Sequence, residues 1–169
     1  LEYIFQPNAK DRGRDIKYLD YVNLSITQIN SWFFSRSAGS WHKFSDLWWC
    51  VLSFTPEILE HEGVIFTTTN NIYSGVKRAT GAAGLEAAFA KNIHQYQGNY
   101  ISRPDELPHN MTTCNQAEVL YPGEISTRYL KTIYVRNEDT ADELAGQFGA
   151  VNHVPVEIQV KAELFRELG

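Results

Sequence analysis

The apolar run "LWWCVLSFT", from Leu47 to Thr55, limits what this chain can fold into more than any other feature of the sequence. Its longest apolar part is only about a third of the roughly 20 residues that a membrane-spanning helix needs. A short, continuous apolar run between polar flanks is typical of a strand that is buried on both faces. We therefore predict a central buried strand at 47–55 and no contact with a membrane.

Shorter segments around this run have the patterns of further strands and helices. Alternating or β-branched residues predict strands at 21–26, 64–69, 119–121, 130–137 and 153–160. Helix formers at 74–90, a capped start at 55–59 and an acidic first turn at 138–148 predict helices. We expect a loop or short turn at 31–37, a turn at 70–71 and a long irregular loop at 92–113. These elements predict one mixed α+β domain over residues 1–169.

Composition and charge narrow the class of protein. Hydrophobic residues make up 43% and aromatic residues 13% of the chain, which is typical of a globular protein. The net charge is −5, so any contact with nucleic acid must come from a local basic patch. The two cysteines, Cys50 and Cys114, form no metal-ligand motif, and no secretion signal is visible. We expect a reduced, cytoplasmic protein without a metal site.

The stretch "TTCNQAEVLYPGEI", Thr112 to Ile125, places Gln116 and Glu118 at the start of a predicted strand, directly after the long loop. Side chains two residues apart in a strand project from the same face, so both would point into one cleft. A Glu in such a place can bind a ribose hydroxyl and stabilise the cationic sugar of glycosyl transfer, while Gln orients the acceptor. The alternative is a solvent-exposed strand end, and the triplet alone does not decide between them.

Two arginine-containing stretches offer partners for a phosphate group. The first is "DRGR", Asp11 to Arg14, and the second is "SRS" around Arg36. A guanidinium group binds pyrophosphate well because its planar donors match the phosphate oxygens. The alternative for "DRGR" is a solvated charged turn. For Arg36 the alternative is a loop held by hydrogen bonds to backbone carbonyls.

Three blocks of the chain together resemble the DarT family of bacterial DNA ADP-ribosyltransferase toxins. They are "DRGR…DYVNLSI…FFSRS" at 11–37, "GVIFTTTNN" at 63–71 and "NQAEVLYPGEISTRYLKTIYV" at 115–135. Their order and spacing cover most of the chain. This sequence departs from the family pattern at Asn23, where the family usually has Pro, and at 38–40, where Ala-Gly-Ser replaces Pro-Met-Leu.

The resemblance implies an ADP-ribosyltransferase-like fold, with mixed, mainly antiparallel sheets around an NAD cleft and NAD as the substrate. It makes Glu118 the catalytic glutamate and residues 92–115 the substrate-recognition loop. It also implies a functional arginine at Arg12 or Arg14, of which we favour Arg12. Family members carry a His and a Thr that hold NAD near the N-terminus, and "LEYIFQPNAK" has no His. We therefore expect that this segment is missing from the domain, or that NAD is bound differently.

These considerations assign hypothetical roles to individual residues. Glu118, Arg12 and Gln116 are the predicted catalytic residues. The predicted NAD-binding residues are Arg14, Tyr21, Phe33, Phe34 and Arg36. The predicted DNA-binding residues are Lys77, Arg78, Lys91, His94, Tyr96, Tyr100 and Arg103. Each of these has an alternative, since loop tyrosines often anchor their own loop and Lys77-Arg78 also suits a solvated helix start.

The predicted function is transfer of ADP-ribose from NAD to a base in single-stranded DNA, because a base must be unstacked before it can react. The resemblance implies a toxin of a toxin–antitoxin or phage-defence system, with an antitoxin protein as a possible partner. The alternatives are an ADP-ribosyltransferase that acts on protein or RNA, and a non-catalytic relative that binds nucleic acid. The modified base, the sequence preference and the oligomeric state stay open.

Overall fold

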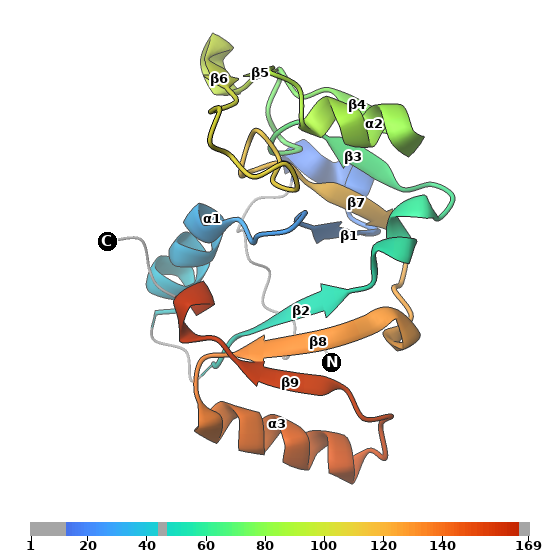
Figure 1. Cartoon of the computed structure of the whole chain (residues 1–169), viewed down its shortest axis with the longest axis vertical. Helices are drawn as coiled ribbons and strands as arrows, with labels where there is room; N and C mark the ends of the chain where they lie inside the picture. The colour runs from blue at the N-terminus through green and yellow to red at the C-terminus, as the bar shows by residue number, and fades with distance from the viewer. Residues whose placement is uncertain (1–12, 44–46, 166–169) are drawn as a thin grey trace. The chain divides into compact units, whose positions relative to one another are not determined.

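The computed structural model describes residues 13–43 and 47–165, with side chains from residue 16 onward (Figure 1). The chain divides into two compact units. The first unit comprises Leu1–Asn30 and Leu59–Ile125, and the second comprises Ser31–Ile58 and Ser126–Gly169. The chain crosses between them more than once, so neither unit is a continuous segment.

An antiparallel sheet of four strands forms the centre of the first unit, in the order β1-β7-β3-β4. These strands are β1 (Tyr21–Leu24), β7 (Val119–Pro122), β3 (Ile65–Thr67) and β4 (Arg78–Thr80). Helix α2 (Gly81–Ala88) lies along β3 and β4, as Figure 1 shows. The helix approaches closely because residue 84 is glycine, where an added Cβ would lie 2.3 Å from the carbonyl oxygen of Ala79. Phe66, Val119 and Leu120 are buried in this unit.

A small hairpin of β5 (Asn92–His94) and β6 (Tyr100–Ser102) follows α2 in the first unit. Its turn includes Gln97 and Gly98, which both have positive φ angles. Such a turn places the side chains at 94, 96 and 100 on a short, ordered ribbon.

The second unit contains α1 (Ser31–Arg36), β2 (Cys50–Phe54), β8 (Leu130–Val135), α3 (Glu138–Ala150) and β9 (Glu157–Val160). Strand β8 pairs antiparallel with β2 and parallel with β9. The core of the second unit contains Ile133 and Val135 from β8 and Leu144 from α3, so α3 packs against the sheet. Asn137 caps α3, since its Oδ1 accepts a hydrogen bond from the Thr140 N–H at 3.0 Å.

The central buried strand predicted at 47–55 is wrong in its extent and its position. Strand β2 begins only at Cys50 and lies at one end of the order β2-β8-β9. Leu52 is 48% exposed, and Trp48 donates from Nε1 to Glu143 at 3.1 Å. Trp49 instead packs edge-on against Phe34 and His42. The aromatic residues of this run therefore pack against helices and neighbouring loops, which apolarity alone cannot distinguish from burial within a sheet.

Three other local predictions are also wrong. Residues 31–36 form α1 instead of a loop, because Phe34 packs against Trp49 and Phe165, which stabilises the helix. The helix predicted at 74–90 begins only at Gly81, after β4 has paired with β3. The irregular loop predicted at 92–113 contains the β5–β6 hairpin. For α1 and α2, contacts with residues distant in the sequence overrode local propensity, whereas the hairpin forms by local pairing of β5 with β6.

The other predicted elements are confirmed within a few residues, as β1, β3, β7, β8, β9 and α3. The mixed α+β class with mainly antiparallel sheets is also confirmed. None of the helices in the described ranges is long and apolar enough to cross a membrane. Among the same residues, no group of three or more His, Cys, Asp or Glu side chains could hold a metal ion.

Candidate active site

Glu118 lies just before β7, and its backbone is held on both sides by Thr67 at the end of β3. Its N–H donates to the Thr67 hydroxyl at 2.9 Å, and its carbonyl accepts from the Thr67 N–H at 2.9 Å. A turn precedes it, closed by a hydrogen bond from the Ala117 N–H to the Cys114 carbonyl. Because Thr67 is buried in the sheet, the position from which the Glu118 side chain extends is well defined.

The carboxylate of Glu118 is held by the loop between β3 and β4. The backbone N–H of Asn71 donates to Glu118 Oε2 at 2.8 Å. Asn71 is in turn held by Arg78, whose Nε donates to Asn71 Oδ1 at 2.7 Å and whose Nη2 donates to the Asn71 carbonyl. The Arg78 guanidinium also lies 5.4 Å from the centre of the Tyr18 ring. A continuous series of contacts thus connects Tyr18 and Arg78 to the orientation of the Glu118 carboxylate.

Gln116 and two tyrosines complete this cluster. Burial raises the pKa of the Tyr73 hydroxyl, a hydrogen bond with the Gln116 side chain opposes that shift, and Cys114, Tyr96 and Glu118 add smaller upward effects on the same pKa. The hydroxyl of Tyr73 is therefore protonated at neutral pH. The ring of Tyr96 lies 5.2 Å from that of Tyr73, at an interplanar angle of 41°.

Two buried polar atoms in the cluster have no hydrogen-bond partner among the residues that the structure describes. They are Nδ2 of Asn71, a donor, and Oε1 of Gln116, an acceptor. Asn71 is only 2% exposed. Buried polar atoms in native proteins nearly always have a partner, so these two mark a place where polar groups of a ligand, or water, can bind.

The arrangement is suited to stabilising a positive charge and placing an acceptor. A carboxylate with a fixed orientation can stabilise a developing oxocarbenium ion and accept a proton. An amide and a neutral tyrosine hydroxyl beside it can orient a polar acceptor. The predicted pair Gln116 and Glu118 thus meets at one cluster, which is more than a solvent-exposed strand end requires.

The structure adds residues to this cluster that the sequence did not single out. Asn71 was expected only as part of a turn, and that turn exists, since the Tyr73 N–H donates to the Asn70 carbonyl at 3.1 Å. Tyr73 and Tyr18 carried no signal, because no motif or spacing connects them to Gln116 or Glu118. Arg78 was predicted to bind DNA, and its contacts are to Asn71 and Tyr18.

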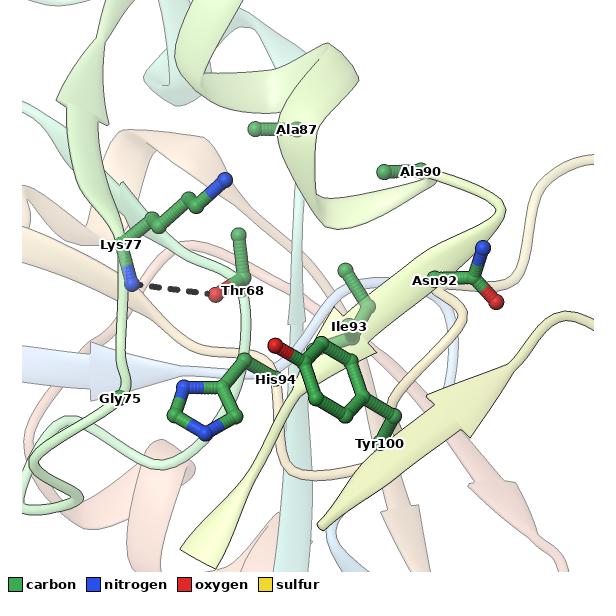
Figure 2. Close-up of a pocket in the computed structure, with 9 residues that line it drawn as sticks. All are labelled: Thr68, Gly75, Lys77, Ala87, Ala90, Asn92, Ile93, His94 and Tyr100. Carbon is green, nitrogen blue, oxygen red and sulfur yellow. Dashed lines mark hydrogen bonds between the residues drawn. The ribbon is translucent and has the colours of Figure 1, made fainter. Parts of the chain in front are cut away.

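The remaining predicted DNA-binding residues lie at several places in the first unit. Figure 2 shows that Lys77, His94 and Tyr100 line one cavity, whereas Tyr96 packs on Tyr73. The side chain of Lys91 is exposed. Arg103 donates to the carbonyls of Met111 at 2.7 Å and Pro108 at 2.8 Å, so its guanidinium holds the loop that leads to Gln116.

The predicted NAD-binding residues are distributed over both units. Tyr21 lies on β1 in the first unit, with its ring 5.5 Å from that of Tyr18. Phe33, Phe34 and Arg36 lie on α1 in the second unit, where the Arg36 guanidinium is 5.8 Å from the Trp32 ring. Arg12 lies outside the described residues. Arg14 lies in the short helix Gly13–Tyr18, and its side chain is not described. These roles stay predictions.

Comparison with protein families gives one match that covers nearly the whole chain. The family DarT, described as ssDNA thymidine ADP-ribosyltransferase, matches residues 5–166. No curated protein matches this sequence significantly.

Comparison with solved structures gives matches at low sequence identity. Thermus sp. 2.9 DarT in complex with NAD+ has a TM-score of 0.62 and 14% identity, over 87% of this chain and 73% of that one. The same protein in complex with ADP-ribosylated ssDNA has a TM-score of 0.61 and 14% identity, over 87% and 69%. Thermosipho africanus DarTG in complex with ADP-ribose has a TM-score of 0.58 and 16% identity, over 86% of this chain and 36% of that one. At such identities the likeness shows a shared fold.

Proposed function

Because the chain belongs to the DarT family of NAD-dependent, single-stranded DNA ADP-ribosyltransferases, we propose that the cluster around Glu118 transfers ADP-ribose from NAD to thymidine. The observation that supports this site most strongly is the hydrogen bond from the Asn71 N–H to Glu118 Oε2, beside Gln116 and Tyr73. The base is taken from the description of the family, which names thymidine.

In the proposed reaction the bond between the anomeric carbon of the ribose and the nicotinamide nitrogen breaks first. The sugar becomes cationic as nicotinamide leaves, and the Glu118 carboxylate stabilises that charge while accepting a hydrogen bond from a ribose hydroxyl. The Asn71 N–H keeps the carboxylate oriented, so little reorganisation is needed as the charge develops. Asn71 Nδ2 and Gln116 Oε1, which lack partners among the described residues, suit polar groups of the two substrates.

The acceptor follows from the chemistry of thymidine. Its N1 is bonded to deoxyribose, so N3 is the ring nitrogen that carries a proton and can form the new bond. As N3 bonds to the anomeric carbon, its proton must leave, and Glu118 is the base in this cluster that can accept it. Gln116 and the neutral Tyr73 hydroxyl orient the thymine edge. An unstacked thymine is required, which a single strand supplies.

Residues further from Glu118 complete the proposal. Tyr96, His94 and Tyr100 stack on bases, and Lys77 and Lys91 bind phosphates. Arg12 or Arg14 binds the pyrophosphate of NAD, with Tyr21, Phe33, Phe34 and Arg36 as further NAD contacts. The support for these roles is the chemistry of each side chain and its place in the family pattern.

The test is transfer of ADP-ribose to an oligonucleotide that contains a single thymidine. We expect the protein to add one ADP-ribose in the presence of NAD, as measured by intact-mass spectrometry. The variant Glu118→Gln should lower the rate by about 10²–10⁴-fold, because it removes the charge and the base. Glu124→Gln, which changes an exposed carboxylate in the same unit, is the matched control and should stay active.

The same assay distinguishes the alternatives. An oligonucleotide with N3-methylthymidine should receive no ADP-ribose, because N3 can no longer form the bond. Modification of that oligonucleotide would show that another atom is the acceptor. Modification of RNA or protein but not of DNA would refute the thymidine proposal and favour one of the other two target classes.

A toxin role, an antitoxin partner and a cytoplasmic location form the last part of the proposal. They are supported by the family resemblance, and modification of thymidines would block replication of a bacterial chromosome. Expression in bacteria should arrest growth, whereas expression of Glu118→Gln should not. Equal growth of both strains, with active enzyme in the lysate, would refute the toxin role.

A further inference from the structure

A cavity of about 230 Å³ lies in the first unit, beside the cluster around Glu118 but separate from it. Figure 2 shows its construction. Ala87 and Ala90 from the end of α2 form one wall, and the rings of His94 and Tyr100 from the β5–β6 hairpin form the opposite wall. Its size suits one planar ring system, since pockets for whole drug-sized ligands are larger, at roughly 300–1,000 Å³.

The two walls have the chemistry of a stacking site. The His94 and Tyr100 rings lie 5.0 Å apart and 36° from parallel, and Tyr100 is 70% exposed. The Tyr100 ring is therefore accessible to a ligand from solvent, with the His94 ring beside it. Aromatic side chains of this kind stack on unpaired bases.

The ends of the cavity are polar. Lys77 and Asn92 line it from opposite sides, and Figure 2 shows the Lys77 side chain directed toward Ala87 and the Asn92 amide directed away from the other lining residues. The Lys77 ammonium has no hydrogen bond or ion pair with any described residue, and no acidic side chain is among the described residues that line the cavity. A single unpaired cation beside two aromatic rings suits a base with its phosphate.

The cavity and the Glu118 cluster are built from the same two segments. The loop between β3 and β4 carries Tyr73 in the cluster, and Gly75 and Lys77 at the cavity. The β5–β6 hairpin carries Tyr96 against Tyr73, and carries His94 and Tyr100 at the cavity. This shared construction is the reason to assign the cavity to the same strand of DNA.

We propose that this cavity binds a base next to the modified thymidine and so sets the sequence context in which the protein acts. The proposal rests on the proposed function. The flanking base stacks on Tyr100 and His94, and its phosphate meets Lys77.

The position of the His94 ring depends on a glycine, which supplies a sharp test. A Cβ added at Gly75 would lie 2.1 Å from Nδ1 of His94, so the ring must move away. Gly75→Ala therefore removes one side of the stack by a single methyl group. Gly146→Ala is the matched control, because a Cβ there meets no atom within 4 Å.

The experiment measures kcat/KM for oligonucleotides that contain one thymidine and an abasic site at each flanking position in turn. With the wild-type protein, loss of the base at one flanking position should lower kcat/KM at least about fivefold, the minimum expected for one base–aromatic stack. In Tyr100→Ala and Gly75→Ala that position-specific loss should disappear, while Tyr100→Phe and Gly146→Ala should keep it.

Several outcomes would overturn the proposal. If Tyr100→Ala and Gly75→Ala are active and still lose kcat/KM at the same abasic position as the wild type, the cavity does not bind a flanking base. A raised KM for NAD with an unchanged profile would assign the cavity to NAD instead. If the wild-type protein modifies no oligonucleotide at all, the proposed function fails and this inference fails with it.

Discussion

Arg78 can either bind a DNA phosphate or orient Glu118, and an experiment can distinguish these two roles. The sequence predicts that it binds DNA phosphates, and the structure shows two hydrogen bonds from its guanidinium to Asn71. Asn71 in turn holds Glu118 Oε2 through its backbone N–H. Lysine at position 78 would keep the positive charge but cannot donate to both oxygens of Asn71, because it lacks the planar fork of arginine. Arg78→Lys therefore tests orientation separately from charge.

The expected fall in kcat follows from the hydrogen bonds that each variant loses. A hydrogen bond from a charged donor contributes about 1.5–3 kcal/mol, and the lower value applies because Arg78 is exposed to solvent. Loss of one bond, at about 1.5 kcal/mol, corresponds to about a tenfold change in rate if it is expressed in the transition state. We expect kcat to fall about tenfold in Arg78→Lys and up to about 100-fold in Arg78→Ala, where both bonds are lost.

The assay is steady-state transfer at a series of salt concentrations, with kcat and the KM for DNA determined separately. Orientation of Glu118 by Arg78 predicts a lower kcat, with little change in KM or in its salt dependence. If Arg78 instead binds a DNA phosphate, Arg78→Ala should keep kcat and raise the KM for DNA. The slope of log KM against log salt concentration should then fall by about one. That second pattern would refute the positioning role. Arg128→Lys, an exposed arginine in the second unit, is the control, and the Tm of each variant detects any loss of folding.

Two further predictions concern Tyr73 and Glu157. Tyr73→Phe removes the hydroxyl that forms a hydrogen bond with Gln116. We expect kcat to fall about fivefold, because one hydrogen bond contributes about 1 kcal/mol. An unchanged kcat would mean that this hydroxyl has no part in the reaction. Hydrogen bonds from Gln159, the larger contribution, and from Thr132 lower the pKa of Glu157 below its ordinary value of 4.5. The charged form of Glu157 therefore stabilises the fold above pH 4.5. This stability is lost as the pH falls through the lowered pKa. Thermal unfolding across this acid range should show a smaller loss of stability for Glu157→Gln than for the wild type, and identical curves would contradict the assignment.

Local patterns in the sequence were sufficient for part of the fold, while the catalytic role of Glu118 stays a prediction. Alternating, β-branched and aromatic residues located β1, β7 and β8, because such residues favour extended backbone, although β7 is buried at Val119, Leu120 and Tyr121 in succession. The acidic first turn located α3, because carboxylates stabilise a helix N-terminus. The family resemblance singled out Glu118 in the triplet at 116–118. The argument from the period of a strand was wrong, because Gln116 lies in a turn and Glu118 lies just before β7. Tertiary packing instead brings both side chains to Tyr73.

The tertiary structure alone decided what surrounds that glutamate. Asn71 is 47 residues from Glu118 in the sequence and 7 residues from Arg78. No local sequence pattern encodes hydrogen bonds between such pairs. The edge position of β2 and the helical state of α1 depend on packing among Phe34, Trp49 and Phe165, which outweighs local propensity. The cavity at Gly75 exists because a loop and a hairpin meet there, and contacts of that kind are determined by the packing of the whole unit.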